Sequence, residues 1–146
     1  MQKNYYGMTS NSIKIPCLKN NLKKVRDFVE HSLEQYVLPA NDINLLVLAV
    51  DELCSNLIIH SHKCNPDEQI EISLHKENDE YIFEISDYNS SPFNVADYKA
   101  PDIHQIVTDK RNGGIGLILV KRIVDKIQFE RKGARNICRI SKRIYA

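Results

Sequence analysis

The sequence predicts a two-layer α/β sandwich of the α+β class, in which three helices cover one face of a largely antiparallel mixed sheet. Two pairs of alternating apolar and polar runs, each joined by a short polar turn, are typical of β-hairpins. Only three stretches have helical spacing of apolar residues, which is enough for one layer of helices but not for two. The 146 residues are the usual size of one domain. We therefore expect a single domain over residues 1–146.

The N-terminal half begins with an alternating run, SIKIPC at 12–17, that predicts a strand. Residues 18–38 have the apolar spacing of an amphipathic helix, which Pro39 ends. A second, more apolar helix follows through residues 43–62, and the Asn-Asp pair at 41–42 can cap its start.

The C-terminal half contains both predicted hairpins. The first spans residues 69–88 and turns at 77–79; the second spans 127–144 and turns near Gly133. Between them lie a polar, irregular stretch at 89–112 and a glycine-rich turn that runs into the third helix, 113–127. An irregular stretch of this length is usually a functional lid or disordered.

Composition excludes several classes of protein. The formal net charge is only +1, whereas a nucleic-acid-binding domain usually has a clear basic excess. The N-terminal residues are too polar for a signal peptide, and no uninterrupted apolar run is long enough to span a bilayer. We expect a cytoplasmic protein with neither a nucleic acid nor a membrane as its partner.

The apolar second helix contains an unusual row of polar residues. On a helical wheel at roughly 100° per residue, Glu52, Asn56 and His60 form an i, i+4, i+8 ridge among apolar side chains. A separate arc forms the natural solvent stripe and contains Asn44, Asp51, Ser55 and His62. The ridge therefore faces a partly buried environment, where an unpaired carboxylate is costly. Either an internal hydrogen-bond network or a binding site explains it, and three polar groups in a row favour the site.

Two further stretches have features of a nucleotide site. Gly113, Gly114 and Gly116 lie at the start of the third helix, where free backbone N–H groups and the helix dipole favour an anion. The sequence there is neither a P-loop nor a Rossmann turn. Asp87 ends an apolar strand and begins the irregular stretch. An aspartate in this place is either a turn former or an acceptor for an amino group in a pocket.

A competing interpretation concerns the motif HSHKC. His60, His62 and Cys64 are potential zinc ligands, which would indicate a zinc-dependent hydrolase. The sequence offers no second short-spaced pair to complete such a site.

Together, the motifs DELCSNLIIH, DYNSSPF and GGIGLILVKRIVD resemble those of the histidine-kinase-like (GHKL) ATPase superfamily, and in particular its small anti-sigma factor serine/threonine kinases. The likeness covers nearly the whole chain and implies the Bergerat-type ATP-binding fold. It also implies ATP and Mg²⁺ as cofactors, with Asn56 as the Mg²⁺ ligand and Glu52 as general base towards the attacking hydroxyl.

The resemblance assigns further residues to the nucleotide. Asp87 would accept a hydrogen bond from the adenine amino group, and residues 94–112 would form the ATP lid. The phosphates would lie against a loop made of Gly113, Gly114, Ile115, Gly116 and Leu117. Lys110 or Arg111 in the lid would neutralise charge on the γ-phosphate.

The sequence departs from the family in two places. Asn89 stands where relatives often have glycine, and asparagine is the non-glycine residue best suited to positive φ. Asn136 stands where relatives frequently have threonine near the adenine. Both departures bear on nucleotide affinity more than on the fold.

By resemblance, the chain transfers the ATP γ-phosphate to a Ser or Thr of an anti-anti-sigma (STAS-type) protein. The likeness also implies binding to a sigma factor and homodimer formation. The alternative is a regulatory module of the same fold that binds nucleotide weakly or not at all and acts by sequestering a partner. Glu52 favours the kinase, because binding alone needs no base, whereas the altered first glycine box favours the module.

Overall fold

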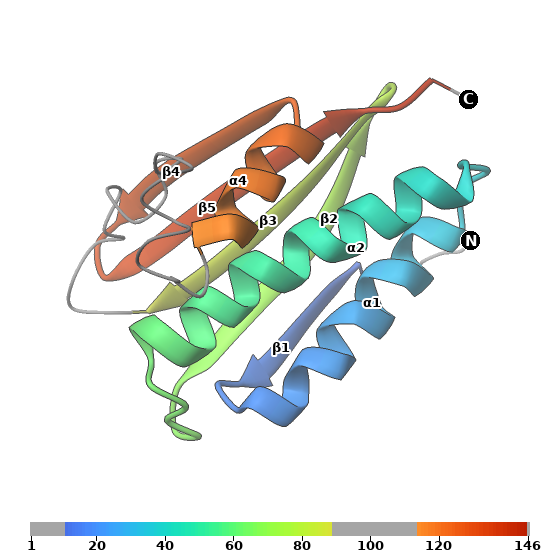
Figure 1. Ribbon diagram of the computed structural model, residues 1–146. Coiled ribbons are helices and arrows are strands. Elements are labelled where there is room, and N and C mark those ends of the chain that lie inside the picture. Colours follow the sequence, from blue (N-terminus) through green and yellow to red (C-terminus); the bar gives the residue numbers. More distant parts are fainter. Residues whose placement is uncertain (1–10, 89–113, 146) are drawn as a thin grey trace.

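The computed structural model describes residues 11–88 and 114–145, which form a layer of helices on one face of a five-stranded sheet (Figure 1). The strands are β1 (Ser12–Pro16), β2 (Gln69–Glu77), β3 (Glu80–Tyr88), β4 (Lys126–Lys132) and β5 (Arg135–Arg143). Their order in the sheet is β1-β2-β3-β5-β4. All four pairings between described strands are antiparallel, so the predicted α+β sandwich is confirmed and its sheet has no parallel pair in this part of the chain.

The helical layer comprises α1 (Leu22–Glu34), α2 (Ala40–Ser55) and α4 (Gly114–Ile123). A short 3₁₀ turn, η1 (Lys19–Asn21), precedes α1, and a π-helical segment, η2 (Asn56–Ser61), continues α2. Figure 1 shows α2 between α1 and α4, and it packs against both. Its central place explains why its sequence is apolar on most sides.

The core lies between the two layers. Strand register alternates side chains, so Tyr81, Phe83, Ile85 and Asp87 of β3 all point to the helices. Fully buried side chains from both layers meet there, including Val29, Leu53, Ile72, Phe83, Val120 and Ile140. Asp87 extends this inward-facing row of β3, and this places a carboxylate at the end of the core.

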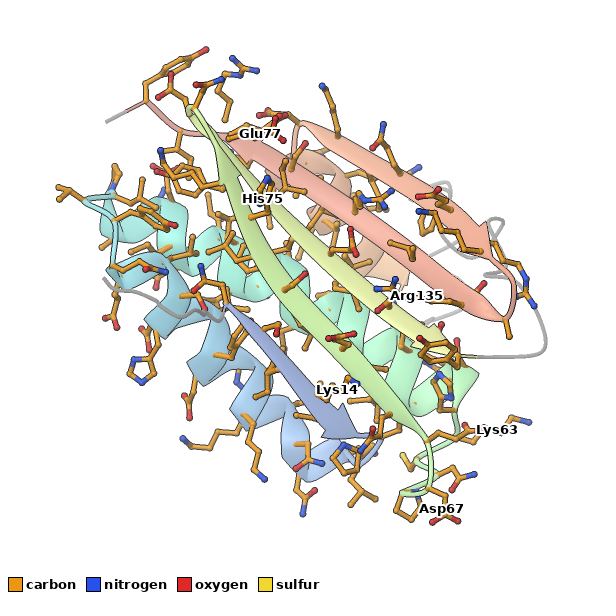
Figure 2. All side chains as sticks on the ribbon, turned by 180° about the vertical axis from the view of Figure 1, so that it is seen from behind. Lys14, Lys63, Asp67, His75, Glu77 and Arg135 are labelled. Carbon is orange, nitrogen blue, oxygen red and sulfur yellow. The ribbon has the colours of Figure 1, made fainter. Side chains whose placement is uncertain are left out.

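The other face of the sheet has no helix on it among the described elements, and Figure 2 shows it from that side. Lys14, His75 and Arg135 lie on this open face. Arg139 links Glu84 and Glu130 across three strands, with N···O distances of 2.8 and 2.6 Å. Ion pairs therefore link the strands on the open face. Ile82 and Ile137 also lie on this face, whereas most apolar residues of the strands alternate towards the helices.

The hairpin turns lie where predicted: Asn78 and Gly133 adopt positive φ of 55° and 62°, which asparagine and glycine tolerate. The predicted cap at 41–42 is wrong, because α2 starts at Ala40 with Pro39 as its N-cap residue. Asp42 instead lies in the first turn, where its charge is favourable to the helix dipole.

The continuous helix Ala40–Ser61 is long and apolar enough, by length and composition alone, to cross a membrane. Its residues Leu46, Val50, Leu53 and Leu57 are buried in the core of this fold. Core helices pass the same test, so the feature is weak evidence for a membrane span.

Candidate nucleotide site

The helix containing the polar ridge changes its geometry at Asn56. From there to Ser61 the helix is π-helical, and the backbone N–H of His62 donates to the Leu57 carbonyl over 2.9 Å. A π-helix has more residues per turn than an α-helix, so the chain after Asn56 falls behind the 100° wheel. By His62 the accumulated lag is on the order of one residue's rotation, about 100°.

Because of this change of geometry, the environments that the helical wheel predicts for the two histidines are both wrong. His62, which the wheel places on the solvent stripe, is buried, and His60, which the wheel places on the ridge, is exposed. The segment then ends in a tight turn: the Cys64 N–H donates to the Ile58 carbonyl over 2.8 Å, and Lys63 and Cys64 adopt positive φ. The ridge is thus reduced to Glu52 and Asn56.

Glu52 is partly buried on α2. Burial raises the pKa of its carboxyl group, and the neighbouring charge of Asp51 raises it further. Asp51 itself pairs with Arg26 of α1 over 3.1 Å. Among the described residues no basic group pairs with Glu52, so no internal salt bridge compensates its charge there. A partly desolvated carboxylate of this kind is suited to accepting a proton.

Asn56 follows Glu52 by one helical turn and is half-buried. Its Nδ2 atom is shielded from solvent and has no hydrogen-bond partner within the described part of the chain. Buried polar groups in proteins are nearly always satisfied, and the exceptions call for a missing ligand, ion or water. The side-chain amide is therefore available to a ligand.

Asp87 and His62 form a buried pair at the end of β3. The Nε2 atom of His62 lies 2.5 Å from Oδ2 of Asp87, and the exposed fractions of the two side chains are 0% and 1%. On the other side of the ring, Nδ1 lies 2.5 Å from Oε1 of Glu68, whose side chain is 44% exposed. Oδ1 of Asp87 is buried and has no partner among the described residues. One carboxylate oxygen is thus fixed by His62 and the other is left to accept a hydrogen bond.

Asn136 of β5 lies opposite Asp87 in the sheet register and is also buried. Its Oδ1 accepts a hydrogen bond from Nη1 of Arg131 over 3.0 Å. Asn136, at the position where the family resemblance places a threonine, therefore lies beside Asp87 in the sheet.

The glycine-rich turn leads directly into α4, whose first residue is Gly114. Gly114, Ile115, Gly116 and Leu117 are the first four residues of this helix, whose N–H groups lack partners within the helix. Figure 1 shows α4 starting beside the C-terminal half of α2, at the side of the molecule where β3 ends. Five predicted features, Asn89, Lys110, Arg111, Gly113 and the lid at 94–112, lie outside the described residues.

The structure does not assemble the zinc site considered from HSHKC. Both ring nitrogens of His62 face carboxylates, and His60 points to solvent. The described residues contain no group of three metal-binding side chains. Sequence reasoning missed the roles of His62 and Glu68, because the shift to π geometry has no clear signature in the residues themselves.

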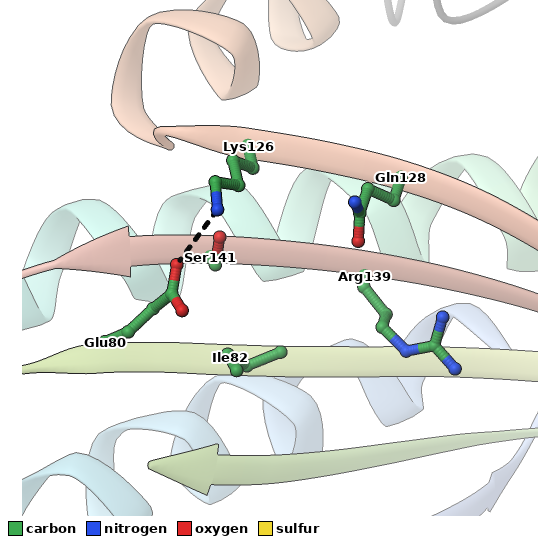
Figure 3. Close-up of a pocket in the computed structure, with 6 residues that line it drawn as sticks. All are labelled: Glu80, Ile82, Lys126, Gln128, Arg139 and Ser141. Atoms are coloured by element: carbon green, nitrogen blue, oxygen red, sulfur yellow. Dashed lines mark ion pairs between the residues drawn. The ribbon is translucent and has the colours of Figure 1, made fainter. Parts of the chain in front are cut away.

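A shallow hollow also lies on the open face of the sheet, lined by Glu80, Ile82, Lys126, Gln128, Arg139 and Ser141 (Figure 3). Lys126 and Glu80 form an ion pair across it at 3.8 Å. Because Ile82 and Asp87 are five residues apart on one strand, their side chains point to opposite faces. The hollow is therefore separate from the candidate site.

A comparison with models of known protein families identifies the family of this domain. The model of the histidine kinase-like ATPase domain matches residues 15–142, which is most of the chain. The chain belongs to this family. The match includes α2, η2, β3 and α4, the elements that contain Glu52, Asn56, Asp87 and the start of the glycine-rich helix. A search of curated proteins gave no match.

Two solved structures have a similar fold and low sequence identity to this chain. The SiaB–SiaC complex from Pseudomonas aeruginosa contains a chain with a TM-score of 0.62 and 11% identity, and the match covers 91% of this ATPase domain and 89% of that chain. The structure of the RsbU and RsbW domains of Rv1364c from Mycobacterium tuberculosis gives a TM-score of 0.58 and 12% identity over 91% of this domain. The match covers 32% of that chain, about a third of its length. These likenesses establish the fold alone.

Proposed function

We propose that this histidine kinase-like ATPase domain is a cytoplasmic, ATP-dependent serine/threonine protein kinase of the anti-sigma type. The observation that carries the proposal is the pair of buried, unpartnered polar atoms, Nδ2 of Asn56 and Oδ1 of Asp87. Both belong to residues that the family resemblance assigns to the nucleotide, yet they lie on separate elements, η2 and β3. Such atoms are costly unless a ligand satisfies them.

The residues present fit Mg-ATP. The unpartnered Nδ2 of Asn56 can donate to a phosphate oxygen, and the amide oxygen of the same side chain is the type of hard ligand that Mg²⁺ accepts. Oδ1 of Asp87 offers an acceptor for the exocyclic amino group of adenine. When bound, Mg-ATP supplies the γ-phosphoryl group and much of the charge compensation for its transfer. The protein itself binds the adenine at Asp87 and the phosphates at the start of α4.

Phosphate binding is assigned to the first turn of α4. The free N–H groups of Gly114, Ile115, Gly116 and Leu117 and the positive end of the helix dipole favour an anion there. Gly113, Asn89 and Arg111 are proposed to complete the site from the neighbouring loops.

Glu52 is proposed as the general base. Its partly desolvated carboxylate, one helical turn before Asn56, has a raised pKa and so accepts a proton more readily than an exposed glutamate. In the proposed step, Glu52 takes the proton of a Ser or Thr hydroxyl as that oxygen attacks the γ-phosphorus. The bond from phosphorus to the bridging oxygen breaks, and ADP leaves.

The proposed substrate is an anti-anti-sigma protein of the STAS type, with a sigma factor as a second partner and a homodimer as the functional form. The fold likeness to SiaB, solved with SiaC, and to the RsbW domain supports a protein partner. Both partners are proposals for this chain, because the sequence identities are 11% and 12%.

The kinase proposal is tested by incubating the purified protein with γ-labelled ATP, Mg²⁺ and a candidate antagonist protein from the same genome. We expect label on a serine or threonine of the antagonist, and a loss of about a hundredfold or more with Glu52→Gln. Transfer at the wild-type rate by Glu52→Gln would remove Glu52 from the proposed role.

The sequestering module remains the second candidate, on the observation that Asn89 replaces glycine after Asp87. A module of this kind binds its partner equally well with and without nucleotide. Complex formation that does not change with millimolar Mg-ATP, together with no label on the partner, would favour it over the kinase.

A further inference from the structure

Among the described residues, His62 is the one buried basic side chain, and the proposed function leaves it without a role. Its side chain is fully buried between Glu68 and Asp87, with 2.5 Å from Nδ1 to Glu68 and from Nε2 to Asp87. A carboxylate only accepts hydrogen bonds, and both nitrogens of an imidazole donate only when the ring is protonated. The geometry therefore describes an imidazolium held between two carboxylates.

We propose that His62 is the specificity-determining positioning residue of the nucleotide site: it occupies one oxygen of Asp87 and keeps the other as an acceptor for an amino-bearing purine. The inference rests on the proposed nucleotide site and goes beyond it by assigning the selection of the base to His62 and Glu68. His62 acts through Asp87 and does not itself touch the base.

The backbone around His62 holds this arrangement in place. The π-helical turn directs His62 inward, and the Asn65 N–H then donates to the His62 carbonyl over 3.0 Å. The Glu68 N–H donates to the Asn65 carbonyl over 3.2 Å, and the Glu68 carbonyl accepts from the Cys17 N–H over 2.9 Å. The π-helical turn and these three hydrogen bonds thus bring the ring and Glu68 together at the end of β1, so the contact is built into the fold.

The pKa of the Cys17 thiol also reflects the negative charges that lie close together at this site. Burial raises its pKa to about 12, and the negative charges of Glu68 and Asp87 add to the rise. A thiol in this state is neutral and offers no compensation to either carboxylate. The proton on the His62 ring does compensate them, and it also links the buried Asp87 to the half-exposed Glu68.

The ionised state of Asp87 decides which purine it favours. A carboxylate at Oδ1 accepts from the 6-amino group of adenine, whereas it faces the 6-keto oxygen of hypoxanthine unfavourably. Without the Nε2–H donor of His62, no described group fixes Oδ2, so the buried side chain is no longer held as an acceptor towards the base and the distinction between an amino and a keto group weakens. His62 therefore sets the preference for ATP over inosine triphosphate (ITP).

Two amide substitutions separate this role from simple packing. In glutamine the amide nitrogen is as many bonds from Cβ as Nε2 of histidine, so His62→Gln keeps a donor towards Asp87. In asparagine it matches Nδ1, so His62→Asn keeps a donor towards Glu68 and loses the one to Asp87. His60→Asn is the matched control, because His60 is exposed two residues earlier.

The experiment measures the dissociation constants of ATP and ITP with Mg²⁺ for the wild type and the three variants. We expect a preference for ATP of about tenfold or more in the wild type, in His60→Asn and, somewhat reduced, in His62→Gln. In His62→Asn the preference should fall to about twofold or less, mainly because ITP binds better relative to ATP.

The outcomes are distinguishable. A wild type that binds neither nucleotide overturns the proposed function and this inference together. A wild type that prefers ATP, with the same ATP-to-ITP ratio in His62→Asn, overturns this inference alone, and so does an equal loss of both affinities.

Should His62→Asn not fold, ¹⁵N NMR of the wild-type histidine rings decides. We expect protons on both nitrogens of His62 in the nucleotide-free protein and a shift of the Nε2–H signal with ATP. A singly protonated His62 ring, or an unchanged signal with bound ATP, would overturn it.

Discussion

Asn56→Ala should separate stability from function, because the side chain it removes makes no hydrogen bond through Nδ2 to any described residue. Removing a buried unsatisfied polar group relieves roughly 1–3 kcal/mol, and the half-burial of Asn56 places the gain at the lower end. Alanine also gains up to about 0.7 kcal/mol in helix propensity over asparagine. Lost side-chain contacts offset part of this.

The net expectation is a variant that is more stable by about 1 kcal/mol, which raises Tm by about 3 °C for a domain of this size. The same variant should lose phosphate transfer, because the proposed Mg²⁺ ligand is gone. Differential scanning calorimetry in nucleotide-free buffer measures the first effect and label transfer measures the second. A variant destabilised by more than about 1 kcal/mol would show that the amide holds the nucleotide-free fold together, and would refute the reasoning.

Three further expectations follow from burial and charge. At neutral pH, the free energy of unfolding of Glu52→Gln should exceed that of the wild type, because a raised pKa in the folded state means that ionisation of Glu52 destabilises the fold as pH rises. Below the usual glutamate pKa the two free energies should converge. Urea titrations at several pH values measure both effects. Phe83→Ala should cost about 3–5 kcal/mol in the urea unfolding free energy, because Phe83 is fully buried at the centre of the sheet; a cost under about 1 kcal/mol would contradict the core described here. In the native protein at pH 8, iodoacetamide should modify Cys64 well before Cys54, whose pKa is raised by complete burial, and peptide mass spectrometry would expose the reverse order.

Much of the fold follows from local patterns. The alternation in residues 69–88 and 127–144 determines both hairpins, since one face of the sheet is buried and any register slip would expose it. Asn78 and Gly133 set the turns, because few other residues adopt positive φ at low cost. The start of α2 was less predictable, since an asparagine and an aspartate suit both the cap and the first turn.

The site was predictable up to Asn56 and not beyond it. Glu52 and Asn56 lie within or at the end of regular helix, so the wheel places them correctly on a partly buried surface. The π-helical segment then rotates the chain, so the two histidines exchange environments. Nothing local in NLIIHS requires this geometry; tertiary contacts of His62 with Asp87 and Glu68, distant in sequence, accompany it.

The central claim is that Asn56 and Asp87 bind the same ligand, Mg-ATP. Thermal stability measured against Mg-ATP concentration tests it most directly, with the wild type, Asn56→Ala and Asp87→Asn compared. At a hundred times Kd, the wild type should gain about 2.7 kcal/mol of stability. Asn56→Ala and Asp87→Asn should each gain far less at the same concentration. No gain by the wild type at millimolar Mg-ATP, or equal gains by all three proteins, would contradict the claim.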